Sequence, residues 1–405
     1  MKTVKLEYLQ AIFVGIIAFA IISPPLANLL EVILIIGCFF NRSVIEALVK
    51  YTQSVDFKIH ASFIVLLLIG FLYPLVETKT YLNNIISWRK FLLLPIGYIL
   101  FTNSQYIKDK AFKFIFYFIV ALTILAMIYK SQLLFFFNEN TIKFHIGSSS
   151  SEGMFVAVAL AIGLWSFTQK EPPVLGFTRL PLALLTLYLM AYIVMFTSGR
   201  SGYIAMFIVL TSMSLIYIKN LKKIIAWKFG LGLIVVATIT VALLSVSKTS
   251  SDRINLAITE FKQSEQNSTK NIYSSVGQRL IFWKNTIDML PQYFVLGVGT
   301  GGFQAAYTKQ VLDKTGLDAL ITQDPHNQYL KILIEQGVIG LLLYLSMILR
   351  VLIQSNKDAS KFVLFSTVLY IWLITSLFNA HFSTFMEGTF IWAWMGLMGS
   401  YSTKP

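Results

Sequence analysis

Long apolar runs are the feature of this 405-residue sequence that most constrains its fold. A helix that crosses a membrane needs about 20 mostly apolar residues. We predict twelve such helices, at residues 8–23, 25–40, 61–76, 91–107, 111–130, 152–168, 180–197, 201–218, 226–246, 327–350, 361–379 and 385–402. The predicted fold class is therefore all-α, a polytopic membrane protein with about twelve transmembrane helices.

The composition supports this prediction. Hydrophobic residues make up 56% of the chain, charged residues make up 13%, and the mean hydropathy is +0.70. Soluble domains have about 25% charged residues, so this chain has too few charges to cover a water-exposed surface. That excludes a cytosolic enzyme and a disordered chain. A single cysteine, Cys38, cannot form an internal disulfide, which excludes a secreted disulfide scaffold.

Charge predicts how the chain is oriented. The net charge is +14, which in a soluble protein would suggest a nucleic-acid partner. Here Lys and Arg concentrate on the segments that face the cytoplasm if the N-terminus lies there, as the positive-inside rule requires. We expect a lipid bilayer around the chain, no nucleic acid, an uncleaved first helix and both termini in the cytoplasm. The predicted organisation is 1–246 with helices one to nine, 247–326 as one long outer loop with short amphipathic helices near 252–261 and 279–290, and 327–405 with helices ten to twelve.

Polar motifs collect on the outer side. The stretch TSGRSGY at 197–203 places Arg200 at the start of a predicted helix. An arginine there opposes the helix dipole. Either an anionic ligand binds the guanidinium together with the backbone N–H groups, or the side chain simply reaches the membrane interface.

Two further motifs carry candidate residues. Arg279 lies in the first turn of the amphipathic helix begun by GQRLIFW at 277–283, where it binds an anion or is a solvated surface charge. His326 precedes the tenth predicted helix and is either structural or a proton-transfer group, because histidine titrates near neutral pH. Lys331 and Glu335 are four residues apart and can pair on one helix face.

Other sequence patterns exclude several chemistries. The glycine-rich run LGVGTGGF at 296–303 lacks the Gly-Lys-Ser/Thr ending of a nucleotide-binding loop, and we interpret it as a turn. We expect no metal and no cofactor. Since the outer side offers no ATP, a transferase there needs a substrate already activated on a lipid. Two arginines suit a diphosphate leaving group, and a histidine suits removal of a proton from an acceptor hydroxyl.

Five stretches together resemble the O-antigen ligase family of bacterial inner membranes, within a wider group of ligases and polymerases. They are TSGRSGY at 197–203, GQRLIFW at 277–283, LGVGTGGF at 296–303, PHNQYLKILIEQGVIG at 325–340 and FNAHFSTFMEGTF at 378–390. The most specific piece is His-Asn-x-Tyr-Leu followed by Glu-x-Gly. The loop IGSSSSEG at 146–153 departs from the family pattern.

The resemblance implies a function and its residues. A membrane glycosyltransferase of this family moves a polysaccharide from undecaprenyl diphosphate, the donor's lipid carrier, to lipid A–core oligosaccharide at the periplasmic face, with no metal, cofactor or ATP. His326 would be the general base, and Arg200 and Arg279 would hold the diphosphate. Further substrate-binding candidates are Arg89, Asn327, Tyr329, His381 and Glu387.

Two alternatives stay open. An O-antigen polymerase uses the same donor chemistry but takes a second lipid-linked glycan as acceptor. A lipid-linked glycan transporter or flippase would also have about twelve helices, but its ionisable groups and broken helices would lie at the membrane midplane. Convergence of His326 with both arginines at the outer side would favour a transferase.

Overall fold

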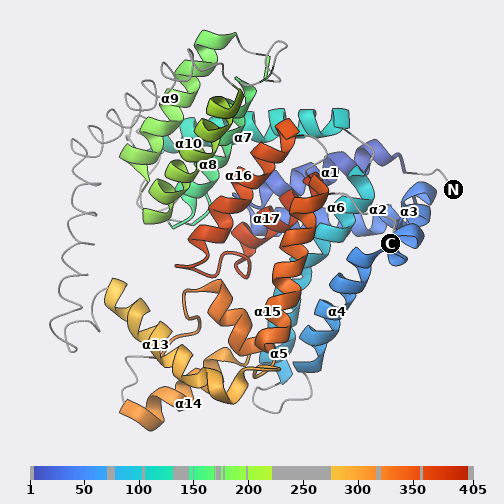
Figure 1. Cartoon of the computed structure of the whole chain (residues 1–405). Coiled ribbons are helices and arrows are strands. Elements are labelled where there is room, and N and C mark those ends of the chain that lie inside the picture. The colour runs from blue at the N-terminus through green and yellow to red at the C-terminus, as the bar shows by residue number, and fades with distance from the viewer. Residues whose placement is uncertain are drawn as a thin grey trace. The chain divides into compact units, whose positions relative to one another are not determined.

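The structure is a computed structural model of the whole chain (Figure 1), and it describes residues 4–70, 78–102, 105–130, 146–148, 150–167, 169, 175–176, 178–197, 199–220, 275–315, 321–355 and 359–399. Within these ranges the regular structure is helical and contains no β-strand. The predicted all-α class is thus confirmed. The chain divides into two compact units.

Unit 1 is built around the buried helix α8. Nearly every residue of α8 is buried, and α7, α9 and α10 pack against it. A Cβ atom on Gly153 would lie 2.5 Å from the Cα of Gly202, so glycines allow α8 and α10 to cross at backbone contact, as in many membrane helix pairs. The helices of unit 1 are α1 Leu6–Phe19, α2 Pro24–Phe39, α7 Gln105–Lys130, α8 Glu152–Ser166, α9 Arg179–Phe196, α10 Arg200–Asn220 and most of α16 Ala359–Thr375.

Unit 2 is built around the buried helix α17. Its residues from Glu387 to Met398 are all buried, and they pack mainly against α6 and the 3-10 helix η2. Trp392 meets Phe91 edge-on, with ring centroids 5.1 Å apart. The elements of unit 2 are α3 Arg42–Thr52, α4 Val55–Ile69, α5 Thr78–Trp88, η2 Arg89–Leu92, α6 Leu93–Phe101, α13 Ser275–Tyr293, α14 Phe303–Thr315, α15 Gln328–Ser355 and α17 Phe385–Met398.

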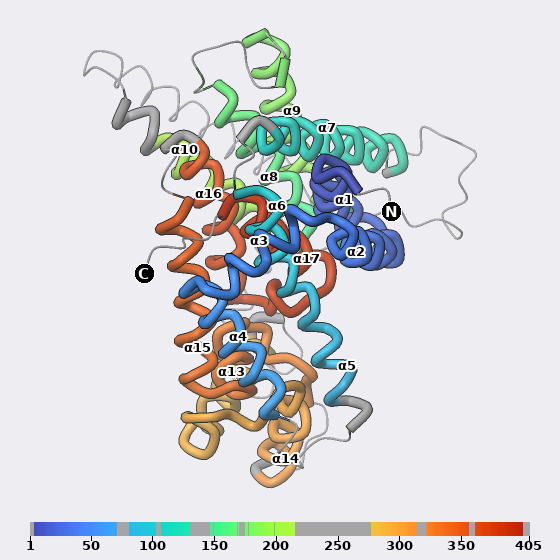
Figure 2. The backbone as a smooth tube through the Cα atoms, turned by 90° about the vertical axis from the view of Figure 1, so that its right-hand side faces the viewer, coloured from blue at the N-terminus to red at the C-terminus, as the bar shows by residue number. Residues whose placement is uncertain are grey.

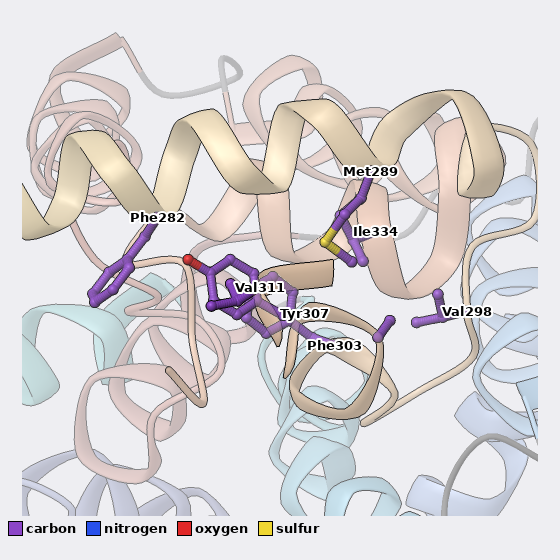
Figure 3. Packing of buried hydrophobic residues seen from close by; sticks show 8 residues of the cluster. Phe282, Met289, Val298, Phe303, Tyr307, Val311 and Ile334 are labelled. Carbon is purple, nitrogen blue, oxygen red and sulfur yellow. The ribbon is translucent and has the colours of Figure 1, made fainter. Parts of the chain in front are cut away.

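Helices α13 and α14 form a small subassembly at one end of unit 2 (Figure 2). Their facing sides bury an apolar cluster (Figure 3), whose members are Phe282, Met289, Val298, Phe303, Ala306, Tyr307, Val311 and Ile334. Ile334 belongs to α15. The cluster therefore fixes the amphipathic helix α13, predicted from residues 279–290, to the helix that follows His326.

Helix α15 is broken at Gly337, which has φ 67° and ψ −172°. The glycine-rich run at 296–303 lies beside this break, and backbone hydrogen bonds join the two segments. Val298 N–H donates to the Ile334 carbonyl at 2.8 Å and Gly299 N–H to the Glu335 carbonyl at 2.9 Å, while Val338 N–H donates to the Phe294 carbonyl at 2.7 Å. These bonds satisfy backbone groups that the broken helix leaves without partners. The run at 296–303 is thus a turn, as predicted, and it also pairs with α15.

Four described helical stretches are long and apolar enough to cross a membrane, and a bent pair could supply a fifth. The four are Tyr81–Phe101, Ile107–Tyr129, Arg179–Phe196 and Gln328–Ser355. Twelve spans and an outer loop stay predictions. The predicted span at 226–246 and the predicted helix at 252–261 lie outside the described residues.

Several predicted boundaries were wrong. The span expected at 91–107 covers the end of one helix and the start of the next, since α6 ends at Phe101 and α7 begins at Gln105. The span expected at 61–76 is the helix α4, which begins at Val55 because the Ser54 hydroxyl accepts the Phe57 N–H at 3.1 Å and caps the helix there. Arg89, two residues before the span predicted at 91–107, instead lies in η2 between α5 and α6, inside the candidate span Tyr81–Phe101. A search for apolar runs does not detect a helix start such as that of α4, whose first turn contains charged residues.

Candidate functional site

The turn that leads into α15 holds His326 in an unusual backbone conformation. Its φ is 51°, the only positive φ at a residue other than glycine among those the structure describes. The Asp324 carboxylate accepts the His326 N–H at 2.7 Å, and the Thr322 hydroxyl donates to the Asp324 carbonyl at 2.8 Å. Left-handed backbone costs free energy in a residue with a Cβ and is kept where the surroundings enforce it, often at functional sites.

The imidazole of His326 is held from two sides. One face stacks on the Phe282 ring of α13, with centroids 6.0 Å apart and planes at 24°. On the edge, Nδ1 lies 3.5 Å from the Asn379 side-chain oxygen. The ring is partly exposed, and no described residue bonds its Nε2, so that nitrogen is available to a substrate.

Asn327 and Tyr329 anchor the start of α15. The Asn327 side-chain oxygen accepts the N–H groups of Tyr329 and Leu330 at 3.0 and 3.1 Å, which is a helix N-cap. Its amide nitrogen donates to the Leu377 carbonyl at 3.1 Å, and the Tyr329 hydroxyl donates to the Leu373 carbonyl at 2.7 Å. In this structure both predicted substrate-binding residues position the backbone around His326.

Gln328 organises the surroundings of the candidate base His326, and the sequence analysis missed it. It is fully buried, and its side-chain oxygen accepts the N–H groups of Phe382 and Ser383, both at 3.1 Å. Its backbone N–H donates to the Ser376 carbonyl at 2.9 Å. Gln328 thereby ties the His326 turn to the segment 376–384. Its place inside the His-Asn-x-Tyr motif was the available signal.

Lys331 forms its ion pair with Asp324, whereas the sequence spacing suggested a pair with Glu335. Its ammonium lies 3.0 Å from an Asp324 carboxylate oxygen. The Glu335 carboxylate accepts instead from the Gly301 N–H and, at 3.3 Å, from the Gln336 amide. Side chains on a helix tilt toward its N-terminus, so Lys331 reaches back to the turn before α15.

Arg279, His381 and Glu387 belong to one electrostatic cluster with Asp324. Burial lowers the pKa of His381 to about 4, an effect opposed by the Glu387 and Asp324 carboxylates and reinforced by the positive charge of Arg279. His381 is 1% exposed, and its Nδ1 has no hydrogen-bond partner among the described residues. The cluster brings charges from α13, α17 and the His326 turn into mutual range.

Arg89 and its neighbour Lys90, both in η2, contact residues at and just before the start of α17. The Arg89 guanidinium carbon is 5.6 Å from the centroid of the Phe385 ring. Lys90 is 3% exposed, and its ammonium donates to the carbonyls of Ser383 and Thr384. The sequence analysis missed Lys90, because an anchor for a segment almost 300 residues away leaves no local pattern.

Arg200 lies in unit 1, where it begins α10 as predicted. The turn before it is tied to the serine-rich loop. The Thr197 hydroxyl donates to the Ile193 carbonyl at 2.6 Å, and the Ser201 hydroxyl donates to the Ser150 carbonyl. Because Arg200 and His326 belong to different compact units, their convergence stays a prediction.

Comparison with protein families supports the resemblance. The family model described as O-antigen ligase matches residues 185–345, a range that includes Arg200, Arg279 and His326. Comparison with curated proteins gives no match. The match confirms the resemblance to the O-antigen ligase family, and it supports a membrane enzyme of the O-antigen ligase and polymerase type.

Proposed function

We propose that this protein is an O-antigen ligase that transfers a polysaccharide from undecaprenyl diphosphate to lipid A–core oligosaccharide, at the periplasmic face of a bacterial inner membrane. His326 Nε2 takes the proton of the acceptor hydroxyl as the new glycosidic bond forms. The bond between the donor sugar and the diphosphate breaks, and undecaprenyl diphosphate leaves. Arg279 and Arg200 stabilise the negative charge that develops on the leaving group.

The observation that carries this proposal is the geometry of His326. Its backbone is held by Asp324 and its ring is held by Phe282 and Asn379. Nε2 has no partner among the described residues, as a base awaiting an acceptor hydroxyl requires. A base fixed in this way needs little reorganisation when substrate binds.

The break in α15 favours a transferase over a transporter. In transporters the unwound carbonyls of broken helices coordinate the transported ion. Here the carbonyls of Ile334 and Glu335 already accept N–H groups from Val298 and Gly299. Each carbonyl therefore has a hydrogen-bond donor from the protein itself, which favours a structural role for the break.

The test is reconstitution of the purified protein with a donor glycan on undecaprenyl diphosphate and with lipid A–core, without added ATP or metal. We expect glycan on lipid A–core, and its loss in a His326→Ala protein that still inserts in the membrane. Longer lipid-linked glycan with unmodified lipid A–core would mean a polymerase. Movement of the donor across the bilayer without any covalent product would mean a transporter and would overturn the proposal.

Arg279→Lys tests the second role in the same assay. A planar guanidinium can bond two phosphate oxygens at once, whereas an ammonium acts as a point charge. We expect initial rates to fall about tenfold, which corresponds to about 1.4 kcal/mol of transition-state stabilisation. Lys284→Arg, at an exposed position on the same helix, is the control and should keep full activity. Full activity of Arg279→Lys would mean that Arg279 is only a surface charge.

A further inference from the structure

We propose that Asn379 is a positioning residue for His326: it keeps the imidazole proton on Nδ1 and so leaves Nε2 as the base. The inference deepens the proposed function and rests on it, since it concerns how the base is prepared. Asn379 lies in the segment between α16 and α17, 53 residues from His326 in sequence.

The proton can be assigned from the hydrogen bonds of Asn379. Its side-chain oxygen faces the Ala380 N–H at 3.2 Å. A backbone N–H can only donate, so this atom of the amide is the oxygen and not the nitrogen. The same oxygen faces His326 Nδ1 at 3.5 Å. Two acceptors cannot bond each other, so Nδ1 carries the hydrogen and Nε2 carries the lone pair.

The ring cannot readily exchange its nitrogens by turning over. The Phe282 ring covers one face of the imidazole, and the backbone of His326 is fixed in the left-handed region by the bond from its N–H to Asp324. With the backbone and one face constrained, the bond to Asn379 decides which nitrogen points to the substrate. Orienting a base through its second nitrogen is a general device in histidine catalysis.

The segment that carries Asn379 is held by hydrogen bonds on both sides of it. The segment around it is bonded at the Ser376 carbonyl by the Gln328 N–H and at the Leu377 carbonyl by the Asn327 amide. Beyond it, Gln328 accepts the N–H groups of Phe382 and Ser383. Asn327 and Gln328, the two residues that follow His326, thus hold the segment whose Asn379 contacts the His326 ring.

The charges near this pair come from four elements. Asp324 and Lys331 form an ion pair on the His326 turn and α15. Arg279 lies on α13, one turn before Phe282, and acts electrostatically on His381, two residues after Asn379. Glu387 on α17 acts on His381 as well. All remain unchanged when Asn379 alone is replaced, so a shift seen in an Asn379 variant comes from that position.

The first experiment needs no enzymatic activity. Diethyl pyrocarbonate modifies neutral imidazole, and peptide mass spectrometry of the full-length protein gives the pH at which modification of His326 reaches half its maximum rate. In Asn379→Asp a carboxylate faces Nδ1 and favours the protonated ring, so we expect this midpoint to rise by about 1 pH unit. Gln304→Glu adds the same charge at an exposed position on α14 and should leave the midpoint unchanged.

The second experiment measures steady-state kinetics on the reconstituted protein. Asn379→Ala should lower kcat about tenfold to a hundredfold with little change in KM, as is typical for loss of a supporting hydrogen bond. Asn379→Asp should recover most of kcat, with the acid limb of the pH profile moved to higher pH. An unchanged modification midpoint in Asn379→Asp would overturn the inference even if the enzyme is a ligase. Absence of activity in the wild-type protein would instead refute the proposed function and leave the modification result intact.

Discussion

Two turns lead into helices that carry candidate residues, and they are built in different ways. The turn before α10 depends on close backbone packing, because Gly202 of α10 meets Gly153 of α8. The turn before α15 depends on polar side chains, since Asp324, Asn327 and Gln328 each bond a backbone group. Glycine packing fixes where a helix lies, whereas side-chain hydrogen bonds fix how one residue is oriented. The second construction is the one that a base requires.

The largest expected effect is at Gln328, which is central to the side-chain hydrogen bonds of the turn before α15. Gln328→Ala leaves the buried N–H group of Phe382 and the partly buried N–H group of Ser383 without their acceptor. Each orphaned group costs about 1–3 kcal/mol, so we expect the free energy of unfolding to fall by about 2–6 kcal/mol. Thermal unfolding in detergent measures this, with Gln304→Ala, exposed on α14, as the control. Equal stability of the two variants would contradict the idea that the turn before α15 depends on side-chain hydrogen bonds.

The next effect is a pH dependence in the same region. The pKa of buried His381 is lowered to about 4 from 6.5, so between these values the unfolded chain binds more protons than the folded protein. Stability is therefore full above about pH 6.5, falls as the pH drops, and levels off below about pH 4. The shift corresponds to about 3 kcal/mol.

His381→Gln isolates this contribution. The variant should lose part of the pH dependence of the unfolding temperature between pH 7 and pH 4, while the other titrating groups keep theirs. Parallel curves for the wild-type protein and the variant would mean that His381 gains its proton without penalty in the folded state.

A smaller effect tests the glycine construction. In Gly202→Ala the new Cβ would lie 2.9 Å from the Gly153 Cα and 3.2 Å from the Thr197 hydroxyl oxygen. Overpacking of this kind costs about 1–3 kcal/mol, which should appear as a lower unfolding temperature. In Gly15→Ala the new Cβ would make only ordinary contact, 3.4 Å from a Leu30 methyl, and we expect no loss. If both variants were equally stable, α8 and α10 would not depend on their glycines.

The smallest effect is at Ser201, whose hydroxyl bonds the Ser150 carbonyl. Ser201→Ala removes one side-chain bond and should cost about 1 kcal/mol, measured in the same unfolding assay. The comparison predicts that this loss is smaller than that of Gly202→Ala, because packing dominates this turn. The reverse order would show that the first turn is also built on polar contacts.

Local sequence patterns predicted much of the fold. The helix expected at 180–197 is α9 Arg179–Phe196, the one at 201–218 is α10 Arg200–Asn220, and the amphipathic stretch at 279–290 lies within α13. These signals are local, since apolar runs and caps act within a few residues. The motif containing His326 and Asn327 also correctly predicted a turn before the helix that is α15.

The contacts that organise the site could not be predicted in this way. Asn379 meets His326 across 53 residues, and Lys90 meets Ser383 across 293. Lys331 has the carboxylates of Asp324 and Glu335 within reach along the chain, and the direction of its side chain selects Asp324. Such pairings depend on how distant segments pack, which no spacing rule within one helix contains.

The break in α15 at Gly337, which is hydrogen-bonded to the glycine-rich run, also has a genetic consequence. A side chain on Gly337 would collide with the backbone of Val295, one on Gly297 would collide with the backbone of Glu335, and both glycines have positive φ. Shortening a neighbouring side chain relieves a clash with a side chain, but it cannot relieve a clash with a main chain. We therefore expect inactivating substitutions at these two codons to yield no intragenic suppressors, and only true revertants to restore function.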